Sequence, residues 1–211
     1  MIFKQLAIGG DRNFAYLIGD PASRRAAVVD PGRNGEMILA EAEALGLDII
    51  YIINTHSHYD HTGANREIKA QTGADIVGYH AAGVDKPVQD GDELRLGQTR
   101  LSIIHTPGHT PDCICILAAG KLCTGDTLFV GKVGGTGFGD DARQEYDSLH
   151  NKLLALPDDT EVFPGHDYGV APVSTIGHER QTNPFLLQPD FASFVQLKRN
   201  WPTYKRQHGI K

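Results

Sequence analysis

The stretch T-H-S-H-Y-D-H-T-G at residues 55–63 holds four potential metal ligands within six positions. They are His56, His58, Asp60 and His61. The preceding apolar run D-I-I-Y-I-I-N predicts a buried strand, so the ligands lie in the loop at its end, where functional groups of layered α/β proteins commonly sit. In an extended segment, residues i and i+2 project to the same side. His56 and His58 can therefore aim at one point while Asp60 and His61 face another, which suits two neighbouring metal ions.

Three further motifs place a glycine directly before a potential ligand at the end of a predicted strand. They read T-P-G-H-T-P, C-T-G-D-T-L and F-P-G-H-D-Y, and their ligands are His109, Asp126 and His166. Glycine permits the sharp turn that exposes the side chain after it. A lone Gly-His or Gly-Asp pair is a weak signal, but the motifs together predict a cluster of five histidines and two carboxylates.

The order of the predicted elements indicates two facing sheets with helices outside. Short β-rich runs open the chain, and strand and helix patterns then alternate, with a second strand-rich half from about residue 112. The predicted helices cover about residues 36–46, 62–72 and 142–156, with two more in a short extension from about 174. We expect a single domain that spans residues 1–211.

Composition limits the classes of function. With 211 residues and 40% hydrophobic content, the chain can bury a sizeable core. A net charge of −6 and a pI near 5.9 disfavour nucleic acid, which needs a basic stripe, so we expect a small-molecule substrate. The three cysteines form no C-x-x-C pair, no signal peptide pattern is seen, and no run approaches the roughly 20 apolar residues of a membrane span. We expect a cytoplasmic location without membrane contact, and the sequence leaves a homodimer open.

Taken in order, T-H-S-H-Y-D-H, T-P-G-H-T, T-G-D-T-L-F and P-G-H-D-Y resemble the metal-binding motifs of the metallo-β-lactamase-fold hydrolases. The resemblance spans residues 13 to about 185 and implies an αββα sandwich, in agreement with the predicted elements. It also implies the role of each ligand. The first metal site is His56, His58 and His109, the second is Asp60, His61 and His166, and Asp126 bridges both, with Asp60 and Asp126 also acting in catalysis.

Asp30, in V-V-D-P-G, matches a carboxylate that supports the metal ligands in this superfamily. A turn residue at the end of a strand explains Asp30 equally well. Tyr168 matches a family position near the substrate thiol, and packing is an equally good explanation. Lys132 is a second candidate for contact with the substrate.

Within the superfamily, P-G-H-D-Y-G followed by S-T-I-G-H-E-R-Q-T-N-P-F is most similar to glyoxalase II (hydroxyacylglutathione hydrolase), with persulfide dioxygenases close behind. Those families show G-x-G-R-x-D-F after the bridging aspartate, where this chain reads G-K-V-G-G-T-G-F. Gly135 therefore replaces the arginine, and Gly137 replaces the aspartate. This departure predicts weak binding of glutathione conjugates.

The implied reaction is thioester hydrolysis with two divalent ions, in the first place Zn²⁺, which supplies hydroxide at neutral pH. A thiol leaves readily because its pKa is about 8.5. One alternative is an iron persulfide dioxygenase that uses only His56, His109 and Asp126. Another is a metal-binding module without catalysis, against which the intact set of seven ligands argues. The loop motif occurs in both enzyme families, so the metal and the thiol-derived substrate stay open.

Overall fold

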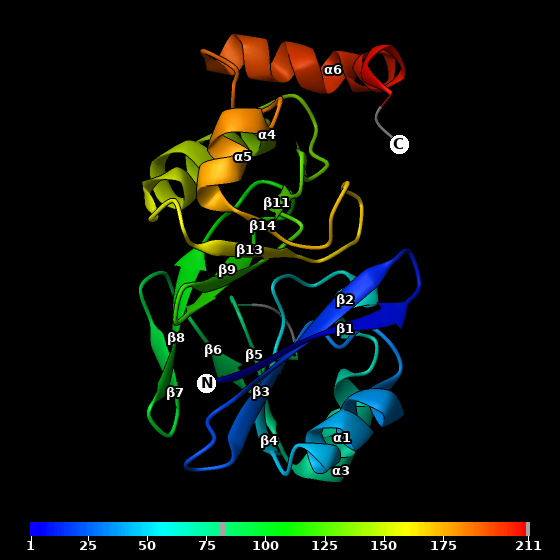
Figure 1. The fold of residues 1–211 in the computed structure, drawn as a ribbon, viewed down its shortest axis with the longest axis vertical. Coiled ribbons are helices and arrows are strands. Elements are labelled where there is room, and N and C mark those ends of the chain that lie inside the picture. Colours follow the sequence, from blue (N-terminus) through cyan, green and yellow to red (C-terminus); the bar gives the residue numbers. More distant parts are fainter. Residues whose placement is uncertain (81–82, 210–211) are drawn as a thin grey trace.

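Two six-stranded sheets face each other in the part of the chain that the computed structural model describes, residues 1–80 and 83–209 (Figure 1). The first sheet has the order β1-β2-β3-β4-β5-β6. Its strands are β1 (Ile2–Gly9), β2 (Asn13–Gly19), β3 (Arg25–Val29), β4 (Asp48–Ile53), β5 (Asp75–Gly78) and β6 (Lys86–Pro87). Pairing is antiparallel from β1 to β3 and parallel from β3 to β6. The carboxyl ends of β3 and β4 therefore meet at one edge, where the loop with His56 begins.

The second sheet has the order β14-β13-β10-β9-β8-β7. Its strands are β7 (Glu93–Leu96), β8 (Thr99–His105), β9 (Ile114–Ala118), β10 (Lys121–Gly125), β13 (Glu161–Pro164) and β14 (Ser174–Thr175). Only the β10–β13 pair is parallel among the pairings described for this sheet. β10 ends directly before Asp126 and β13 ends two residues before His166, which brings both residues to one edge. A short hairpin, β11 (Leu128–Phe129) and β12 (Lys132–Val133), follows β10.

Helices cover the outer face of each sheet (Figure 1). α1 (Gly35–Ala44) and α3 (Asn65–Thr72) cover the first sheet, while α4 (Asp140–Asp147) and α5 (Ile176–Thr182) lie on the second and α6 (Phe191–His208) packs outside them against α4. The single turn α2 (Tyr59–Thr62) carries two of the candidate ligands, Asp60 and His61. The predicted αββα sandwich is confirmed.

Three apolar clusters hold these layers together. The central one lies between the sheets and contains Ile53, Leu101 and Ile116. The outer two join each sheet to its helices, for example through Ile38 under α1 and Phe194 under α6. All seven residues of β2 are buried, because both faces of a central strand in such a sandwich are covered.

The helix predicted over about 142–156 differs in the structure. α4 ends at Asp147, and the chain continues as a π turn over Ser148–Lys152 and a 3₁₀ turn over Leu153–Ala155. Apolar spacing does not separate α from π or 3₁₀ winding over one or two turns, so the sequence pattern could not show the change.

The two tail helices are present as predicted. Asp190 caps α6 by accepting a hydrogen bond from the Ser193 amide at 2.8 Å, and α6 ends at Gly209 in the left-handed conformation. No described helix combines the length and the apolar content needed to cross a bilayer. That residues 1–211 form one independent domain stays a prediction.

Candidate metal centre

His56, His58 and His109 meet at one end of the centre. His56 and His58 lie in the extended segment between β4 and α2, and His109 follows β8. The Nδ1 atom of His58 lies 3.0 Å from His56 Nε2 and 3.1 Å from His109 Nε2. Three imidazole nitrogens thus converge on one point: Nδ1 of His58 and Nε2 of His56 and His109.

Asp60, His61 and His166 form a second set beside the first. Asp60 and His61 lie on α2, and His166 lies two residues after the end of β13. The Nε2 atoms of His61 and His166 are 3.3 Å apart. Asp60 Oδ2 lies 3.7 Å from the first of these nitrogens and 3.4 Å from the second.

Asp126 lies between the two sets and presents one oxygen to each. Its Oδ1 is 3.4 Å from His61 Nε2 and 3.5 Å from His166 Nε2, while its Oδ2 is 3.6 Å from His109 Nε2. Oδ1 is buried and has no hydrogen-bond partner among the described residues. A buried carboxylate oxygen in that position is costly unless a cation satisfies it.

The donor spacings fit metal ions. Zn–N bonds of about 2.0–2.1 Å place the nitrogens of a tetrahedral site roughly 3.3–3.4 Å apart. The nitrogen pairs of both sets have nearly that spacing, and each set offers three ligand atoms within 4.8 Å of one another. Imidazole and carboxylate are ligands that zinc and iron both accept.

Outer hydrogen bonds orient four of the five histidines. The Nδ1 atoms of His61, His109 and His166 donate to Asp30 Oδ2, Gly135 O and Asp11 O at 2.9, 2.8 and 2.8 Å. The Nδ1 atom of His56 lies 3.1 Å from Thr55 Oγ1. A proton on each Nδ1 leaves the Nε2 lone pair for a metal, as is usual for histidine ligands.

Asp30 is the hub of this outer layer. It is 1% exposed, and its carboxylate accepts the Thr55 amide at 2.7 Å, the Thr55 hydroxyl at 2.6 Å and His61 Nδ1 at 2.9 Å. Because the Thr55 hydroxyl donates to Asp30, it is free to accept from His56. Asp30 thus reaches one histidine of each set, directly or through Thr55, and is more than a turn residue at a strand end.

Asn13 is a residue that sequence reasoning missed. Its amide nitrogen donates to Asp60 O at 3.2 Å and to Asp60 Oδ2 at 3.0 Å. It starts β2, lies 47 positions before Asp60 and has no metal-ligand motif around it, so nothing local marks it. Asn13 thereby orients Asp60 Oδ2, the same oxygen that faces His61 and His166.

Two histidines of the first set, His56 and His109, favour the neutral form. Burial and the neighbouring His61 lower the pKa of His56 to about 3, and burial also lowers the pKa of His109. Both rings therefore keep free lone pairs at neutral pH, the form that binds a metal.

The second set attracts positive charge. Burial disfavours a charge on His61, yet Asp30 and Asp126 raise its pKa, and Asp126 does the same for His166. Burial also opposes the charge of Asp126, but these two histidines hold its pKa well below the usual range. A proton and a metal ion compete for the same lone pairs here.

Two glycines let the second sheet approach the loop closely. Gly125 has φ 49°, and a Cβ there would lie 2.4 Å from Thr55 Oγ1. At Gly165, a Cβ would lie 2.6 Å from Asp126 Oδ1 and 2.8 Å from His61 Cε1. Gly125, like Gly108 before His109 with φ 152°, has a positive φ that suits the predicted sharp turn, whereas Gly165 has none and is required for close approach.

Tyr168 and Lys132 lie beside the second set. The Tyr168 ring stacks on His166 with centroids 4.6 Å apart and donates its hydroxyl to Asp11. Burial and Asp11 raise the pKa of this phenol, so it stays protonated. Lys132 Nζ lies 4.4 Å from the centre of the same ring.

The glycine-rich segment 131–139 closes the other side of the first set. Lys198 of α6 donates to Gly134 O at 2.8 Å and pairs with the fully buried Glu145 of α4. The next carbonyl, Gly135 O, is the one that accepts from His109. Sequence reasoning also missed the Glu145–Lys198 pair, because these two residues lie 53 positions apart and carry no motif.

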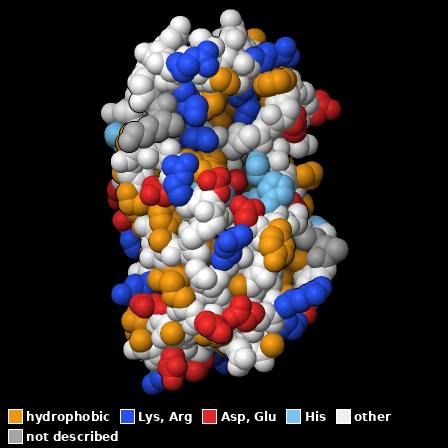
Figure 2. All heavy atoms as spheres, turned by 90° about the vertical axis from the view of Figure 1, so that its right-hand side faces the viewer, with side chains coloured by type: hydrophobic (Ala, Val, Ile, Leu, Met, Phe, Trp, Pro, Cys, Tyr) orange, Lys and Arg blue, Asp and Glu red, His pale blue; other side chains and the backbone are white. Residues whose placement is uncertain are grey.

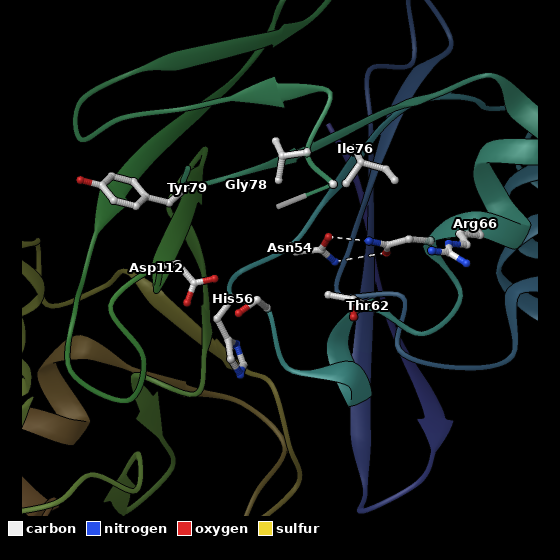
Figure 3. A pocket seen from close by; sticks show the side chains of 12 residues that line it. Asn54, His56, Thr62, Arg66, Ile76, Gly78, Tyr79 and Asp112 are labelled. Atoms are coloured by element: carbon white, nitrogen blue, oxygen red, sulfur yellow. Dashed lines mark hydrogen bonds between the residues drawn. The ribbon is translucent and has the colours of Figure 1, made fainter. Parts of the chain in front are cut away.

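A cavity of about 250 Å³ lies on the far side of the loop (Figure 3). Asn54 and Asn65 exchange two amide hydrogen bonds in its wall, at 2.7 and 3.3 Å. The His56 ring points away from this pair. The amides thus brace the loop from behind, and the ligand atoms of His56 face the metal sets.

The chain is similar to known proteins in sequence and in fold. Residues 8–166 match the model of the metallo-beta-lactamase superfamily. Hydroxyacylglutathione hydrolase of Rhodospirillum rubrum is 45% identical over 171 residues, 78% of this chain and 65% of that protein. The human mitochondrial persulfide dioxygenase ETHE1 is 36% identical over 184 residues, 82% of this chain and 71% of that protein.

The crystal structure of ETHE1 from Myxococcus xanthus superposes with a TM-score of 0.88 at 37% identity, covering 95% of this chain and 91% of that one. The chain spans only 65% and 63% of the length of the two hydroxyacylglutathione hydrolases that it matches at 45% and 42% identity. By its matched residues and its fold, the chain belongs to the metallo-β-lactamase superfamily, whose members bind divalent metal ions.

Proposed function

We propose that this protein is a metal-dependent thioester hydrolase of the hydroxyacylglutathione hydrolase type. The observation that carries the proposal is the position of Asp126, whose Oδ1 faces the second set while its Oδ2 faces His109. A carboxylate that serves two ligand sets supports a centre of two ions. The identity of 45% to a hydroxyacylglutathione hydrolase supports the substrate class.

In this proposal the seven ligands are those that the sequence indicates. His56, His58 and His109 would hold one ion and Asp60, His61 and His166 the other, with Asp126 as the ligand whose two oxygens face both sets. Zinc ions in such a centre supply Lewis acidity and hydroxide at neutral pH.

The protein's own groups then orient the reactants. Asn13 fixes Asp60 Oδ2, and the pKa of Asp60 is lowered by this amide and the two histidines against the effect of burial, so Asp60 stays a carboxylate at neutral pH. Asp60 can accept a hydrogen bond from the attacking water and so orient a lone pair of that water toward the thioester carbonyl. The Tyr168 ring offers a flat surface for the substrate. The thiol needs no proton donor, because its pKa of about 8.5 makes it a good leaving group.

A mononuclear iron persulfide dioxygenase is the second candidate, favoured by the TM-score of 0.88 to ETHE1 from Myxococcus xanthus. That enzyme type would need only His56, His109 and Asp126. Asp30 and Asn13 also orient His61 and Asp60, residues that a single-ion site would not use.

Substitution of His58 separates the candidates. In a two-ion hydrolase, His58→Ala lowers thioesterase activity by roughly two orders of magnitude and bound metal from about two ions to about one per chain. His105→Ala is the control, since His105 stacks on Tyr79 outside both sets. Full thioesterase activity in His58→Ala would reject the assignment of the first set. Metal binding without turnover of any thioester or persulfide would instead indicate a non-catalytic module.

The three cysteines, Cys113, Cys115 and Cys123, are buried thiols without disulfides. Burial raises the pKa of Cys113 and Cys115 to about 12, which keeps both thiols protonated and unreactive. These free thiols support the proposal of a reducing, cytoplasmic location.

A further inference from the structure

A buried ion pair joins α4 to α6, the helix that packs outside it (Figure 1). The side chains of Lys198 and Glu145 are 6% and 0% exposed. Lys198 Nζ also lies 5.2 Å from the centre of the Phe194 ring and 5.9 Å from that of Phe185. The charges of this pair are therefore enclosed by apolar groups of the layer outside the second sheet.

An ion pair that is buried so deeply is a poor source of stability. Removing both charges from water costs free energy that their mutual attraction often fails to offset. Here the cost is larger, because Glu145 Oε1 is buried and has no hydrogen-bond partner among the described residues. Apolar side chains of similar volume are often as stable in such a place. The pair is therefore better explained by what it holds in position.

Glu145 packs against the turn that carries His109. A Cβ at Gly108 would lie 2.4 Å from Glu145 Cβ and 2.5 Å from Glu145 Cα, so this turn touches the α4 backbone. Ser148, which directly follows α4, donates its hydroxyl to Pro107 O at 2.8 Å. Helix α4 and the residue after it thus hold the two residues that precede His109.

Lys198 holds the segment of residues 131–139 that orients the His109 ring. Lys198 Nζ donates to Gly134 O at 2.8 Å, and the next carbonyl, Gly135 O, accepts from His109 Nδ1 at 2.8 Å. A Cβ at Gly134 would lie 3.0 Å from Glu145 Oε1 and 3.1 Å from His109 Cβ. The carboxylate of the pair, the histidine and the segment therefore meet at Gly134.

The pair itself lies away from the open side of the centre. Figure 2 shows histidine side chains gathered at the surface on one face, beside acidic side chains. By contrast, the side chains of Glu145 and Lys198 are almost completely covered. The pair can therefore act on the centre through the backbone around His109, but not by contact with a substrate.

We propose that Glu145 and Lys198 are positioning residues for the first metal ion. The pair joins the turn that carries His109 to the segment that accepts its Nδ1 proton, which fixes the tautomer and aims Nε2 at the first set. An apolar pair would fill the same space but would leave Gly134 O without this donor. The inference rests on the ligand assignment in the proposed function, but not on the thioester substrate.

Replacement of the pair by apolar side chains tests the proposal. Competition with a zinc chelator measures the two zinc Kd values of the wild type and of the double variant Lys198→Met with Glu145→Leu. We expect one Kd to rise roughly 10- to 100-fold, as is usual when an outer partner of a metal ligand is lost, while the other stays the same. The urea midpoint, measured with excess chelator, should not fall, because an apolar pair has no charges to desolvate. Two unchanged zinc Kd values would overturn the proposal.

The His109→Ala background shows whether the pair acts through this histidine. In that background the apolar replacement should leave the zinc Kd values unchanged, because no ring remains to be oriented. A rise of roughly 10-fold or more that persists without His109 would overturn the proposal, whether or not the variant is also less stable. Wild-type zinc affinity in His109→Ala itself would reject the ligand assignment, and the proposal with it.

The tautomer of His109 is a readout that needs neither metal nor turnover. Long-range ¹H–¹⁵N NMR spectra of the metal-free wild type should show the proton on Nδ1, and those of the double variant a larger share on Nε2. The same tautomer in both proteins would contradict the proposal. If the wild type hydrolyses no thioester, the proposed function fails, while the NMR spectra and the zinc Kd values still decide the role of the pair.

Lys121→Met is the matched control for both measurements. Lys121 also lies over two rings, with Nζ 5.3 Å from Phe3 and 5.1 Å from Phe163, and it pairs with Glu161. It lies at the start of β10, the end of that strand away from Asp126. This variant should keep the wild-type tautomer of the histidine and both zinc Kd values.

Discussion

The loop of residues 54–61 and the segment of residues 131–139 flank the same centre, but different interactions hold them. The loop is fixed by short polar side chains around it, chiefly Asp30 and the Asn54–Asn65 pair. The segment is fixed by buried charges on distant helices, with Lys198 and Glu145 at Gly134 and Glu179 at Gly131. Short polar side chains therefore hold the loop, whereas the segment depends on buried charges of the carboxyl-terminal helices.

Asp30→Asn tests the local network and should have the largest effect. The asparagine amide can no longer accept from both Thr55 and His61, so His61 takes the tautomer with its proton on Nε2 and loses that lone pair. We expect metal affinity to fall roughly 10- to 100-fold, as is usual when a residue that hydrogen-bonds to a metal ligand is changed. The free energy of unfolding should fall by about 3–5 kcal/mol, because one partner of a buried pair is removed. Metal titration and urea denaturation measure these two quantities.

Asp20→Asn is the matched control for this variant. Asp20 is also a buried carboxylate, and it accepts from the Ser23 amide, the Ser23 hydroxyl and the Thr99 hydroxyl, away from the centre. It should lose stability while keeping metal affinity. Equal metal affinity in Asp30→Asn and in the wild type would contradict the role of Asp30 as hub.

Glu145→Gln tests the charged network through pH. Burial raises the pKa of Glu145 to about 7 despite its pairing with Lys198. A raised folded-state pKa gives a stabilising contribution that is complete below the unfolded value near 4.5 and is lost as the pH rises through 7. The free energy of unfolding of the wild type, minus that of Glu145→Gln, should thus fall by on the order of 3 kcal/mol between pH 4.5 and 8.

Urea denaturation at a series of pH values measures this difference. The metal ligands are the same in both proteins, so their titration cancels in the subtraction. Parallel pH profiles for the two proteins would show that Glu145 keeps an ordinary pKa and that the segment is held in another way.

Gly135→Arg tests the segment of residues 131–139 directly, and its expected change in binding free energy is the smallest of the three variants. Gly135 has no positive φ, and a Cβ there meets nothing within 4 Å, so an arginine can be accommodated. A bidentate contact to a carboxylate is worth about 1.5–3 kcal/mol, which lowers the KM for S-lactoylglutathione by about one to two orders of magnitude. S-lactoyl-N-acetylcysteamine serves as the reference substrate and should respond little. Micromolar KM values for S-lactoylglutathione in the wild type would show that the missing arginine does not limit binding.

The sequence predicts the two regions unequally, for a physical reason. Metal ligands need a restricted set of residue types, and the candidate ligands here lie in the short loops that follow strands, so His56 to His61, His109, Asp126 and His166 stand out as motifs. The alternation of strands and helices likewise indicates the sandwich. The supports of segment 131–139 show no such signal, since Glu145 and Lys198 read as ordinary charged positions of amphipathic helices until the fold buries them together.

The metal content of protein purified without oxygen, measured beside its activity, tests the account most directly. We predict about two divalent ions per chain and hydrolysis of S-lactoylglutathione or a related thioester, without oxygen consumption on glutathione persulfide. A result of about one iron ion per chain, with oxygen consumed on the persulfide and no thioester hydrolysis, would contradict the two-ion hydrolase and favour the dioxygenase.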